Sequence, residues 1–216
     1  MTPLPRFTET GFKKIKIPEK LYFDMLVAYN QSRFHEVVNK SHYHPEYDLH
    51  VADGSVAMLN NPEPFCLKAT IPPYQFNRWA KELQPILEEW SGTELEFVQG
   101  YGIRCYLKDS LLTVHRDNVD THVISCIIFL DEHPKVNWPL DFLDHEGVHH
   151  KVTFERGEML LYESLCVHAR TTPFLGEYYR NMYFHWRPVD WDYQPYINQK
   201  VMYKSIEEAQ KEIRGE

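Results

Sequence analysis

Two histidines and one aspartate form the set of side chains in this sequence that is best suited to bind a metal. His115 and Asp117 lie two residues apart after the apolar run 111–114, and His168 follows a second apolar stretch, 159–167. On a β-strand, residues two apart point to the same face, so His115 and Asp117 can chelate one ion. Two imidazoles and one carboxylate on one face of Fe(II) leave coordination positions open for a bidentate cosubstrate and O2. We therefore predict a catalytic metal site at His115, Asp117 and His168.

The His-x-Asp triplet is a weak signal by itself, because the chain contains 12 histidines and 31 acidic residues. A histidine at a strand end beside a solvated aspartate is the alternative that the triplet leaves open. The prediction therefore depends on the strands that surround it.

Composition limits the classes of protein to which the chain can belong. Its 216 residues are 43% hydrophobic and 14% aromatic, which is enough for one sizeable core in a single domain, 1–216. The net charge of −8, without a cluster of Lys or Arg, argues against nucleic acid as a partner. No apolar segment has the length of a membrane span, and the N-terminal residues lack the apolar core of a signal peptide.

The cysteines carry a further expectation about the compartment. None of the four belongs to a C-x-x-C pair, and most lie in apolar runs, as buried reduced thiols do in cytosolic proteins. We expect a cytoplasmic protein without a membrane partner. The four are Cys66, Cys105, Cys126 and Cys166.

Residues 1–95 are predicted to form a helical N-terminal support region with long connections. One helix follows Pro18, where apolar residues repeat with the spacing of one buried face. A second helix begins at Pro72-Pro73 and ends before Gly92, and Pro85 is expected to kink or split it. Between them we predict a polar surface loop, with a metal site as the less favoured alternative. The histidines of that loop are His42, His44 and His50.

Residues 96–188 have a different pattern, with short segments rich in β-branched and aromatic residues separated by turn signals such as Arg156-Gly157. About eight short strands with this spacing predict an antiparallel sandwich or barrel. Residues 189–216 are predicted to form a C-terminal extension, in which the capping-box pattern at 205–208 starts a short helix. The fold class that we predict is mainly β with flanking helices (α+β), with the N-terminal helices packed on one sheet.

Several motifs in the C-terminal 120 residues follow one another in a recognisable order. Tyr106 precedes the His-x-Asp triplet, the strand-like run 122–130 follows it, and Arg156-Gly157-Glu158 opens the segment before His168. The run 168–173 and the later glycine at 176 complete the series. In this order the motifs resemble the prolyl 4-hydroxylase-like branch of the Fe(II)/2-oxoglutarate-dependent dioxygenases. The resemblance implies a double-stranded β-helix (a cupin-like jelly roll) as the catalytic core.

The resemblance also implies an activity. Fe(II) would be held by His115, Asp117 and His168, with 2-oxoglutarate and O2 as cosubstrates and ascorbate as a supporting reductant. The reaction would be hydroxylation of an unactivated C–H bond, coupled to decarboxylation of 2-oxoglutarate to succinate and CO2. The implied substrate is a small molecule or a peptide, most specifically a prolyl residue or a free amino acid. Two other classes stay open: a cupin-type hydrolase or isomerase that uses Zn(II) or Mn(II), and a non-catalytic jelly-roll binding protein.

The sequence departs from the family pattern at the residue that binds the distal carboxylate of 2-oxoglutarate. The family places a Lys or Arg about ten residues after the distal histidine, where this chain has Tyr178. Arg180 is our first choice as its replacement and Arg170 the close second, since a guanidinium binds a carboxylate through two hydrogen bonds. Tyr106 is expected to add a hydroxyl group to the same carboxylate.

The remaining polar and aromatic residues of the core are open to two interpretations. His122 and His185 could face a substrate, but we expect packed histidines with backbone partners. Glu163 could orient a metal ligand, although a solvated carboxylate is the favoured interpretation. We expect three aromatic residues to belong to the core more readily than to a pocket: Trp138, Tyr162 and Trp186.

Overall fold

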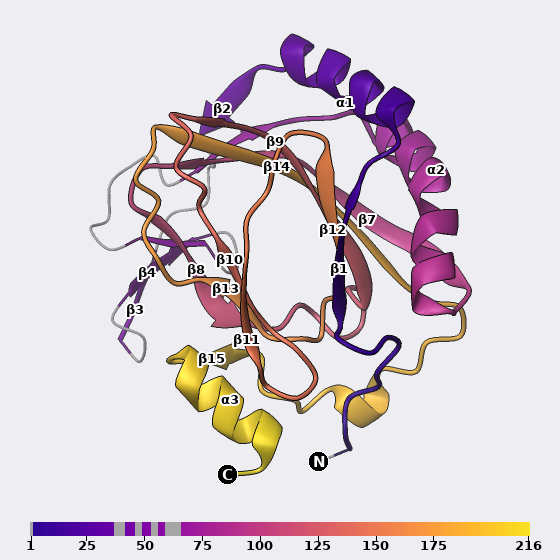
Figure 1. Ribbon diagram of the computed structural model, residues 1–216, viewed down its shortest axis with the longest axis vertical. Coiled ribbons are helices and arrows are strands. Elements are labelled where there is room, and N and C mark those ends of the chain that lie inside the picture. Colours follow the sequence, from indigo (N-terminus) through magenta and orange to yellow (C-terminus); the bar gives the residue numbers. More distant parts are fainter. Residues whose placement is uncertain (1, 37–41, 46–48, 53–55, 59–65) are drawn as a thin grey trace.

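The computed structural model describes residues 2–36, 42–45, 49–52, 56–58 and 66–216, and its described strands form two antiparallel β-sheets that face each other (Figure 1). One sheet has the order β1 (Phe12–Lys16), β12 (Glu158–Glu163), β9 (Ile124–His133), β14 (Tyr178–Pro188), β7 (Leu95–Leu107), β6 (Cys66–Ala69) and β2 (Phe34–Glu36). The other has the order β11 (His149–Val152), β10 (Leu140–Leu143), β13 (His168–Arg170), β8 (Ser110–His115), β5 (Val56–Met58), β4 (Leu49–Ala52) and β3 (His42–His44), and β15 (Met202–Tyr203) pairs with β8.

From β7 to β14 the chain crosses repeatedly between the two sheets, in the manner of a double-stranded β-helix. Strands β7, β9, β12 and β14 lie in the first sheet, and β8, β10, β11 and β13 lie in the second. The chain thus returns repeatedly to each sheet, with β10 and β11 as one hairpin within the second sheet, and side chains from both inner faces meet between the sheets. This arrangement confirms the predicted mainly β fold with a jelly-roll core.

Two helices cover the outer face of the first sheet (Figure 1). They are α1 (Glu19–Gln31) and α2 (Pro73–Ser91), as the sequence predicted. Pro73 occupies the first turn of α2, and Gly92 ends the helix with a φ of 70°. The helix runs through Pro85 without splitting, because the exposed position of this proline lets water satisfy the carbonyl group that loses its partner.

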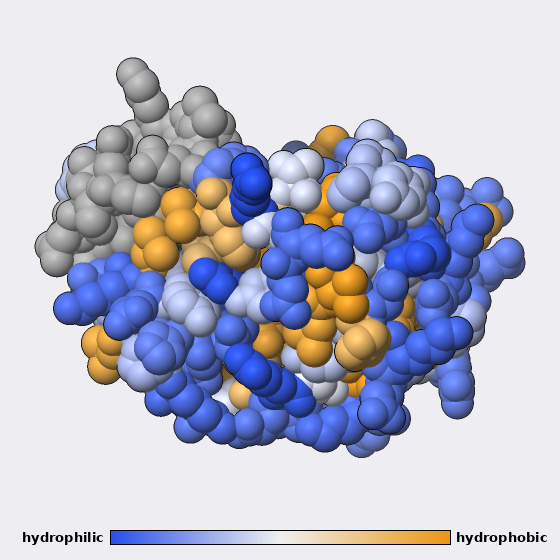
Figure 2. Space-filling view, turned by 90° about the horizontal axis from the view of Figure 1, so that it is seen from above, coloured by the Kyte–Doolittle hydropathy of each residue, from blue (hydrophilic) through white to orange (hydrophobic). Residues whose placement is uncertain are grey.

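The inner residues of the two helices form a core with the sheet, and their outer residues face solvent. Leu21, Met25 and Ala28 of α1 are buried, whereas Phe23 and Val27 of the same helix are exposed. Figure 2 views the molecule from the side of α1 and shows a face that is mostly hydrophilic, with apolar areas between the polar ones. The helices therefore act as a cover that holds the first sheet in place.

Alternation along β14 sends neighbouring residues to opposite sides of the first sheet. Met182, Phe184 and Trp186 pack in the core between the sheet and the helices. Tyr179 and Tyr183 instead belong to the core between the two sheets. Because a strand has a period of two, the odd-numbered positions of this stretch of β14 face the interior of the barrel.

The prediction that residues 1–95 are helical with long connections was incomplete. Strand β1 pairs with β12, β2 and β6 extend the first sheet beyond β7, and β3 to β5 extend the second sheet beyond β8. The segment that was predicted as a loop with His42 and His44 includes β3, and His50 lies in β4; the side chains of these histidines lie outside the described residues. These short strands pair with strands much later in the chain, so local periodicity carries little signal for them.

The C-terminal extension contains β15, a short 3-10 helix η1 (Gln194–Tyr196) and helix α3 (Ile206–Arg214). The Ser205 side chain accepts a hydrogen bond from the Glu208 backbone N–H at 3.2 Å, as the capping pattern predicted. All four cysteines are buried and free of disulfides. Within the described part of the chain, no helix combines the length and the apolar character that a membrane span requires. The cytoplasmic location stays a prediction.

Trp79 of α2 is expected to be a main contributor to the packing of the helical cover. Its ring is fully buried, and its indole N–H donates to Asp24 of α1 at 2.5 Å. Trp79→Ala should lower the free energy of unfolding by about 3–5 kcal/mol because it leaves a cavity in a packed core. Tyr74→Ala, at an exposed position of the same helix, is the matched control. Denaturant unfolding checks this, and equal effects of the two substitutions would contradict it.

Candidate functional site

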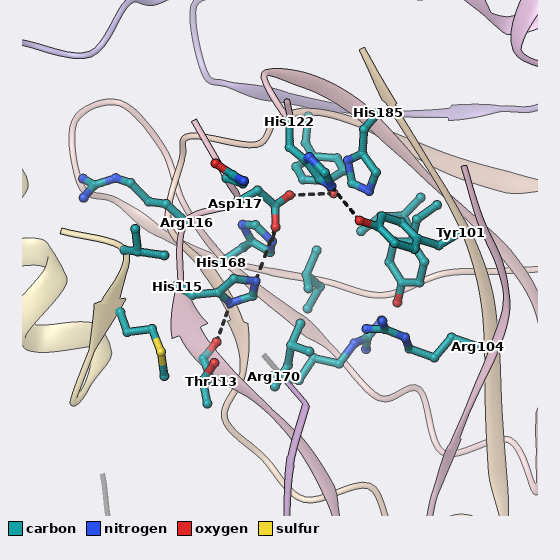
Figure 3. A pocket seen from close by; sticks show the side chains of 18 of the residues that line it. Tyr101, Arg104, Thr113, His115, Arg116, Asp117, His122, His168, Arg170 and His185 are labelled. Atoms are coloured by element: carbon teal, nitrogen blue, oxygen red, sulfur yellow. Dashed lines mark hydrogen bonds and ion pairs between the residues drawn. The ribbon is translucent and has the colours of Figure 1, made fainter. Parts of the chain in front are cut away.

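The predicted metal ligands converge where β8 and β13 pair. His115 is the last residue of β8 and His168 the first of β13, and the two stand opposite each other in the register of the sheet. Their ring centroids are 4.4 Å apart. Asp117 follows β8, and its backbone N–H donates to the Ser164 carbonyl at 3.0 Å, which fixes the chain direction after the strand. Figure 3 shows all three side chains pointing toward a common point.

Both histidines are held in an orientation that suits metal binding. The Nδ1 atom of His115 lies 2.7 Å from the Thr113 carbonyl oxygen, and the Nδ1 atom of His168 lies 3.0 Å from the Cys166 carbonyl oxygen. A carbonyl oxygen can only accept, so each Nδ1 carries a proton, and in the neutral form of the ring Nε2 then keeps its lone pair. The backbone thereby aims both Nε2 atoms at the site.

The distances within the triad fit a single ion. Oδ1 of Asp117 lies 3.5 Å from Nε2 of His115 and 3.7 Å from Nε2 of His168. Ligand atoms at about 2.1 Å from one metal, separated by 90° to 110°, lie about 3.0–3.4 Å apart. Small side-chain movements would therefore bring the three atoms into one coordination sphere. Tyr162 steadies the carboxylate from the other side, with its hydroxyl donating to Oδ2 at 3.3 Å.

The protonation states also favour a metal. Burial alone would raise the pKa of Asp117, but the nearby imidazoles of His168, His115 and His185 outweigh it and hold that pKa well below its usual range. Burial, together with the adjacent His115, lowers the pKa of His168 to about 4. At neutral pH the site thus offers a carboxylate and an unprotonated imidazole, the forms that metals bind.

A pocket of about 380 Å³ extends from the triad into the space between the two sheets. Polar side chains from both sheets line it, and three arginines are among them. Arg170 comes from β13, Arg104 from β7, and Arg116 from the loop after β8. Asp117 is the one acidic residue among the described residues that line this pocket. The pocket is therefore suited to an anionic ligand.

Arg170 lies deeper in the barrel than the triad, on the same strand as His168. Its guanidinium group is fully buried between two aromatic rings, 4.3 Å from the Trp138 centroid and 4.5 Å from the Tyr179 centroid. It donates to the Trp138 carbonyl group and, at 3.1 Å, to the Tyr179 hydroxyl. Trp138 thus belongs to the core, as predicted, and its position fixes the arginine.

Arg180, our first choice for binding 2-oxoglutarate, lies on the wrong side of the sheet. Its guanidinium group donates to the Tyr29 hydroxyl of α1 and packs 4.4 Å from the Phe34 ring centroid, and the residue does not line the pocket. The prediction placed Arg180 on the face of Tyr178, which is correct, but that face looks toward the helices. Sequence offsets fix which residues share a face and do not say which face is the inner one.

Arg104 is a pocket residue that the sequence did not single out. It lies two residues before Tyr106 on β7, and both line the pocket. The Tyr106 hydroxyl lies 2.7 Å from that of Tyr183 on the neighbouring strand β14. The even offset from Tyr106 was the available signal for Arg104. Figure 3 shows Arg104 and Arg170 reaching into the pocket from different strands.

His122 and His185 line the pocket beside Asp117, with Tyr101 next to them. We expected backbone hydrogen-bond partners for the two histidines, and this prediction was wrong. Side-chain hydroxyl groups are their partners, as described below. Burial lowers the pKa of His122, and burial together with His122 lowers the pKa of His185 well below its ordinary value. Tyr162 also lines the pocket, whereas Trp186 belongs to the helical core, as predicted.

Glu163 is buried, so the expectation of a solvated carboxylate was wrong. It accepts hydrogen bonds from the backbone N–H groups of Phe7 at 3.2 Å and Thr8 at 2.8 Å, and His145 lies 3.1 Å away. With Cys166, His145 and Glu163 also form a group of three that could hold a metal. The bonds from Phe7 and Thr8 already occupy both carboxylate oxygens, and they assign Glu163 the role of fixing the N-terminal segment.

Arg116, which separates two of the metal ligands in the sequence, ties this loop to the C-terminal extension. Its Nε donates to the Leu165 carbonyl at 2.9 Å, and its Nη1 donates to the Lys200 carbonyl at 3.1 Å. The same Nη1 contacts Glu212 of α3 at 3.0 Å and the Tyr203 hydroxyl of β15. These partners hold the buried guanidinium group in a single orientation. Through Arg116 they therefore also fix the loop that carries Asp117.

Comparisons with known proteins agree with this fold. No family model and no curated protein sequence matches the chain. Solved structures do match: HygX from Streptomyces hygroscopicus with nickel, 2-oxoglutarate and hygromycin B bound is 12% identical, with a TM-score of 0.53, over 83% of this chain and 83% of that chain. A Pseudomonas putida prolyl-4-hydroxylase is 13% identical, with a TM-score of 0.52, over 83% of this chain and 93% of that chain.

A third solved structure, an oxidoreductase of the 2OG-Fe(II) oxygenase family from Burkholderia pseudomallei, is 12% identical. It has a TM-score of 0.52 and matches over 82% of this chain and 85% of that chain. The chain therefore has the double-stranded β-helix fold of 2-oxoglutarate- and iron-dependent oxygenases, as the sequence resemblance implied.

Glu212→Ala is expected to loosen the loop that carries Asp117. It removes the carboxylate that, among the described residues, pairs with the buried Arg116 guanidinium, so the free energy of unfolding should fall by about 1–3 kcal/mol. The affinity for Ni(II), measured by titration calorimetry, should fall several-fold as well. Glu207→Ala, at an exposed position in the first turn of the same helix, should cost less than about 1 kcal/mol. An unchanged metal affinity in Glu212→Ala would show that the contact between α3 and Arg116 does not affect the metal site.

Proposed function

We propose that this chain is an Fe(II)- and 2-oxoglutarate-dependent oxygenase that hydroxylates an unactivated C–H bond. The observation that carries the proposal is the register of β8 with β13, which brings His115 and His168 together with Asp117 at the mouth of a pocket that contains buried arginines. The fold shared with the oxygenases supports it.

His115, Asp117 and His168 would hold the iron through Nε2, Oδ1 and Nε2. When bound, Fe(II) supplies the reduction of O2 that couples decarboxylation of 2-oxoglutarate to succinate and CO2 with hydroxylation of the substrate. The protein orients the ligands through the Thr113 and Cys166 carbonyl groups and encloses the reacting groups between two sheets. Three protein ligands leave coordination positions for the cosubstrate.

Arg170 is the residue that we propose to bind the distal carboxylate of 2-oxoglutarate. It lies two residues beyond His168, which corresponds to about 6–7 Å along a strand and is comparable with the separation of the carboxylates of a five-carbon dicarboxylate. Trp138 and Tyr179 hold its guanidinium group rigidly, so little conformational entropy is lost on binding. Arg104 and the Tyr106 hydroxyl, from β7, would complete the carboxylate site.

The charges in the pocket favour this function over a cupin-type hydrolase. A dianionic cosubstrate would balance Arg104, Arg170 and a divalent metal that Asp117 neutralises only in part. A hydrolase that uses Zn(II) or Mn(II) with water has no need of two arginines in the depth of the barrel. For the substrate we propose a small molecule or a peptide, and a prolyl residue or an amino acid is the first class to test.

His168→Ala should abolish Fe(II) binding and turnover while the fold is retained. The substitution removes one of three ligands, and metal affinity depends on all of them. The measurement is O2-dependent formation of succinate from 2-oxoglutarate with Fe(II) and ascorbate, with circular dichroism as the control for folding. Wild-type rates in the variant would refute the ligand assignment. An absence of succinate from the wild-type protein would favour the hydrolase or the binding protein.

Arg170→Leu should weaken 2-oxoglutarate binding much more than metal binding. Loss of a buried charged hydrogen-bond partner costs about 2–5 kcal/mol, which corresponds to an increase of about 30-fold or more in the 2-oxoglutarate Kd. Arg180→Leu is the matched control, because it removes the same group from the outer face of the sheet. Calorimetric titration of the Ni(II)-loaded variants with 2-oxoglutarate checks this. A larger increase in the 2-oxoglutarate Kd for Arg180→Leu than for Arg170→Leu would instead assign the carboxylate contact to Arg180.

A further inference from the structure

Three aromatic side chains with polar atoms gather on the pocket wall beside Asp117, and we refer to them as the mouth cluster. They are Tyr101 of β7, His122 of the loop before β9, and His185 of β14. Figure 3 shows them grouped on the side of the carboxylate away from His115. Three separate elements thus supply one cluster, which none of the assignments above uses.

A bulge in β7 brings Tyr101 to this place. Tyr183 of β14 stands opposite Tyr101, and Asn181 stands opposite Arg104. Over this stretch β7 therefore contains one more residue than β14. The bulge allows Tyr101 and Arg104, three residues apart, both to line the pocket. Gly102 lies within it, where an added Cβ would be 2.3 Å from the Ala69 carbonyl oxygen. The backbone is therefore shaped to present the tyrosine.

The side chains of the mouth cluster are packed closely together. The ring centroids of His122 and His185 are 3.8 Å apart, and the Tyr101 centroid lies 5.4 Å from that of His185. The Tyr101 hydroxyl lies 3.3 Å from Nε2 of His122. Two imidazoles at this distance, both buried, repel each other if both are charged, so at most one of the two carries a charge.

The hydrogen bonds leave one polar atom available. Nδ1 of His122 lies 2.6 Å from the Thr121 hydroxyl, and Nδ1 of His185 lies 2.7 Å from the Ser125 hydroxyl. Within the described part of the chain, no hydrogen bond reaches Nε2 of His185. A serine hydroxyl can either donate or accept, so this Nε2 can serve as an acceptor or as a donor, depending on the tautomer. A ligand group that both donates and accepts fits it best.

The surroundings disfavour a charged group at this place. Among the described residues that line the pocket, Asp117 is committed to the metal, and Arg116 is paired with Glu212. Arg104 and Arg170 are proposed to bind 2-oxoglutarate. A free carboxylate or ammonium group of a substrate would lose its hydration here without gaining an opposite charge, which costs more than burying a neutral amide or hydroxyl group.

We propose that the mouth cluster is a substrate subsite that takes an uncharged hydrogen-bonding group, an amide or a hydroxyl, through Nε2 of His185. This rests on the proposed function and sharpens it, because an amino acid would enter as a residue with blocked ends, as within a peptide, and not as the free zwitterion. Contact at this point, beside Asp117, would hold the neighbouring C–H bond close to the metal.

Calorimetric binding of three probes to the protein loaded with Ni(II) and 2-oxoglutarate tests the proposal. N-acetyl-L-prolinamide carries uncharged amides, myo-inositol carries hydroxyl groups, and L-proline is a zwitterion. At least one of the uncharged probes should bind, and at least tenfold more tightly than L-proline. The uncharged probe that binds more tightly shows whether the subsite takes an amide or a hydroxyl group. Binding of neither uncharged probe, or tighter binding of L-proline, overturns the proposal.

Variants then locate the contact. His185→Phe should weaken the uncharged probe at least tenfold, and His185→Gln, which keeps a donor and an acceptor, should restore part of the loss. His35→Phe, at an exposed position of β2, is the matched control. If the wild-type protein and His185→Phe bind the uncharged probe equally well, the proposed subsite is wrong. Failure of the wild-type protein to bind Ni(II) and 2-oxoglutarate is a different result, because it overturns the proposed function itself.

Discussion

The register between β8 and β13 is the constraint on which the site depends. A shift of one residue would turn His168 to the other face of the sheet and would leave His115 without its neighbour. Three features hold the register: the strands on either side of the pair, the Asp117 N–H bond to Ser164, and the backbone carbonyl groups that accept from both imidazoles. The geometry of the candidate metal site is thus a property of the sheet more than of any single loop.

The interior of the barrel is organised around buried positive charge. Arg170 is among the largest fully buried side chains of the described residues, and it lies between two aromatic rings and donates only to neutral acceptors among its hydrogen bonds. A guanidinium group without a carboxylate partner is costly in a protein interior unless a ligand supplies the opposite charge. The positive charge of Arg170 would therefore be balanced when a dicarboxylate binds in the pocket. Until then the stacking against two aromatic rings keeps the guanidinium group in place.

The sequence was sufficient for the parts of the fold with local signals. The helix of Trp79, the cap at Ser205 and the strands that carry His115 and His168 all follow from periodicity and turn residues. The choice between Arg170 and Arg180 needed the structure, because a period of two cannot say which face is the inner one. Likewise, β3 to β5 depend on partners far along the chain, and the bulge that presents Tyr101 leaves little more than a glycine as its signal.

The contact between Arg116 and α3 has a consequence for the order in which the protein matures. Glu212 is synthesised long after Asp117, so a nascent chain can pair β8 with β13 while Arg116 has only its Leu165 partner and still lacks those of the C-terminal extension. Full rigidity of the triad comes only when β15 and α3 have left the ribosome and docked. A metal that binds before this stage would meet ligands on a loop that still lacks its contacts with α3.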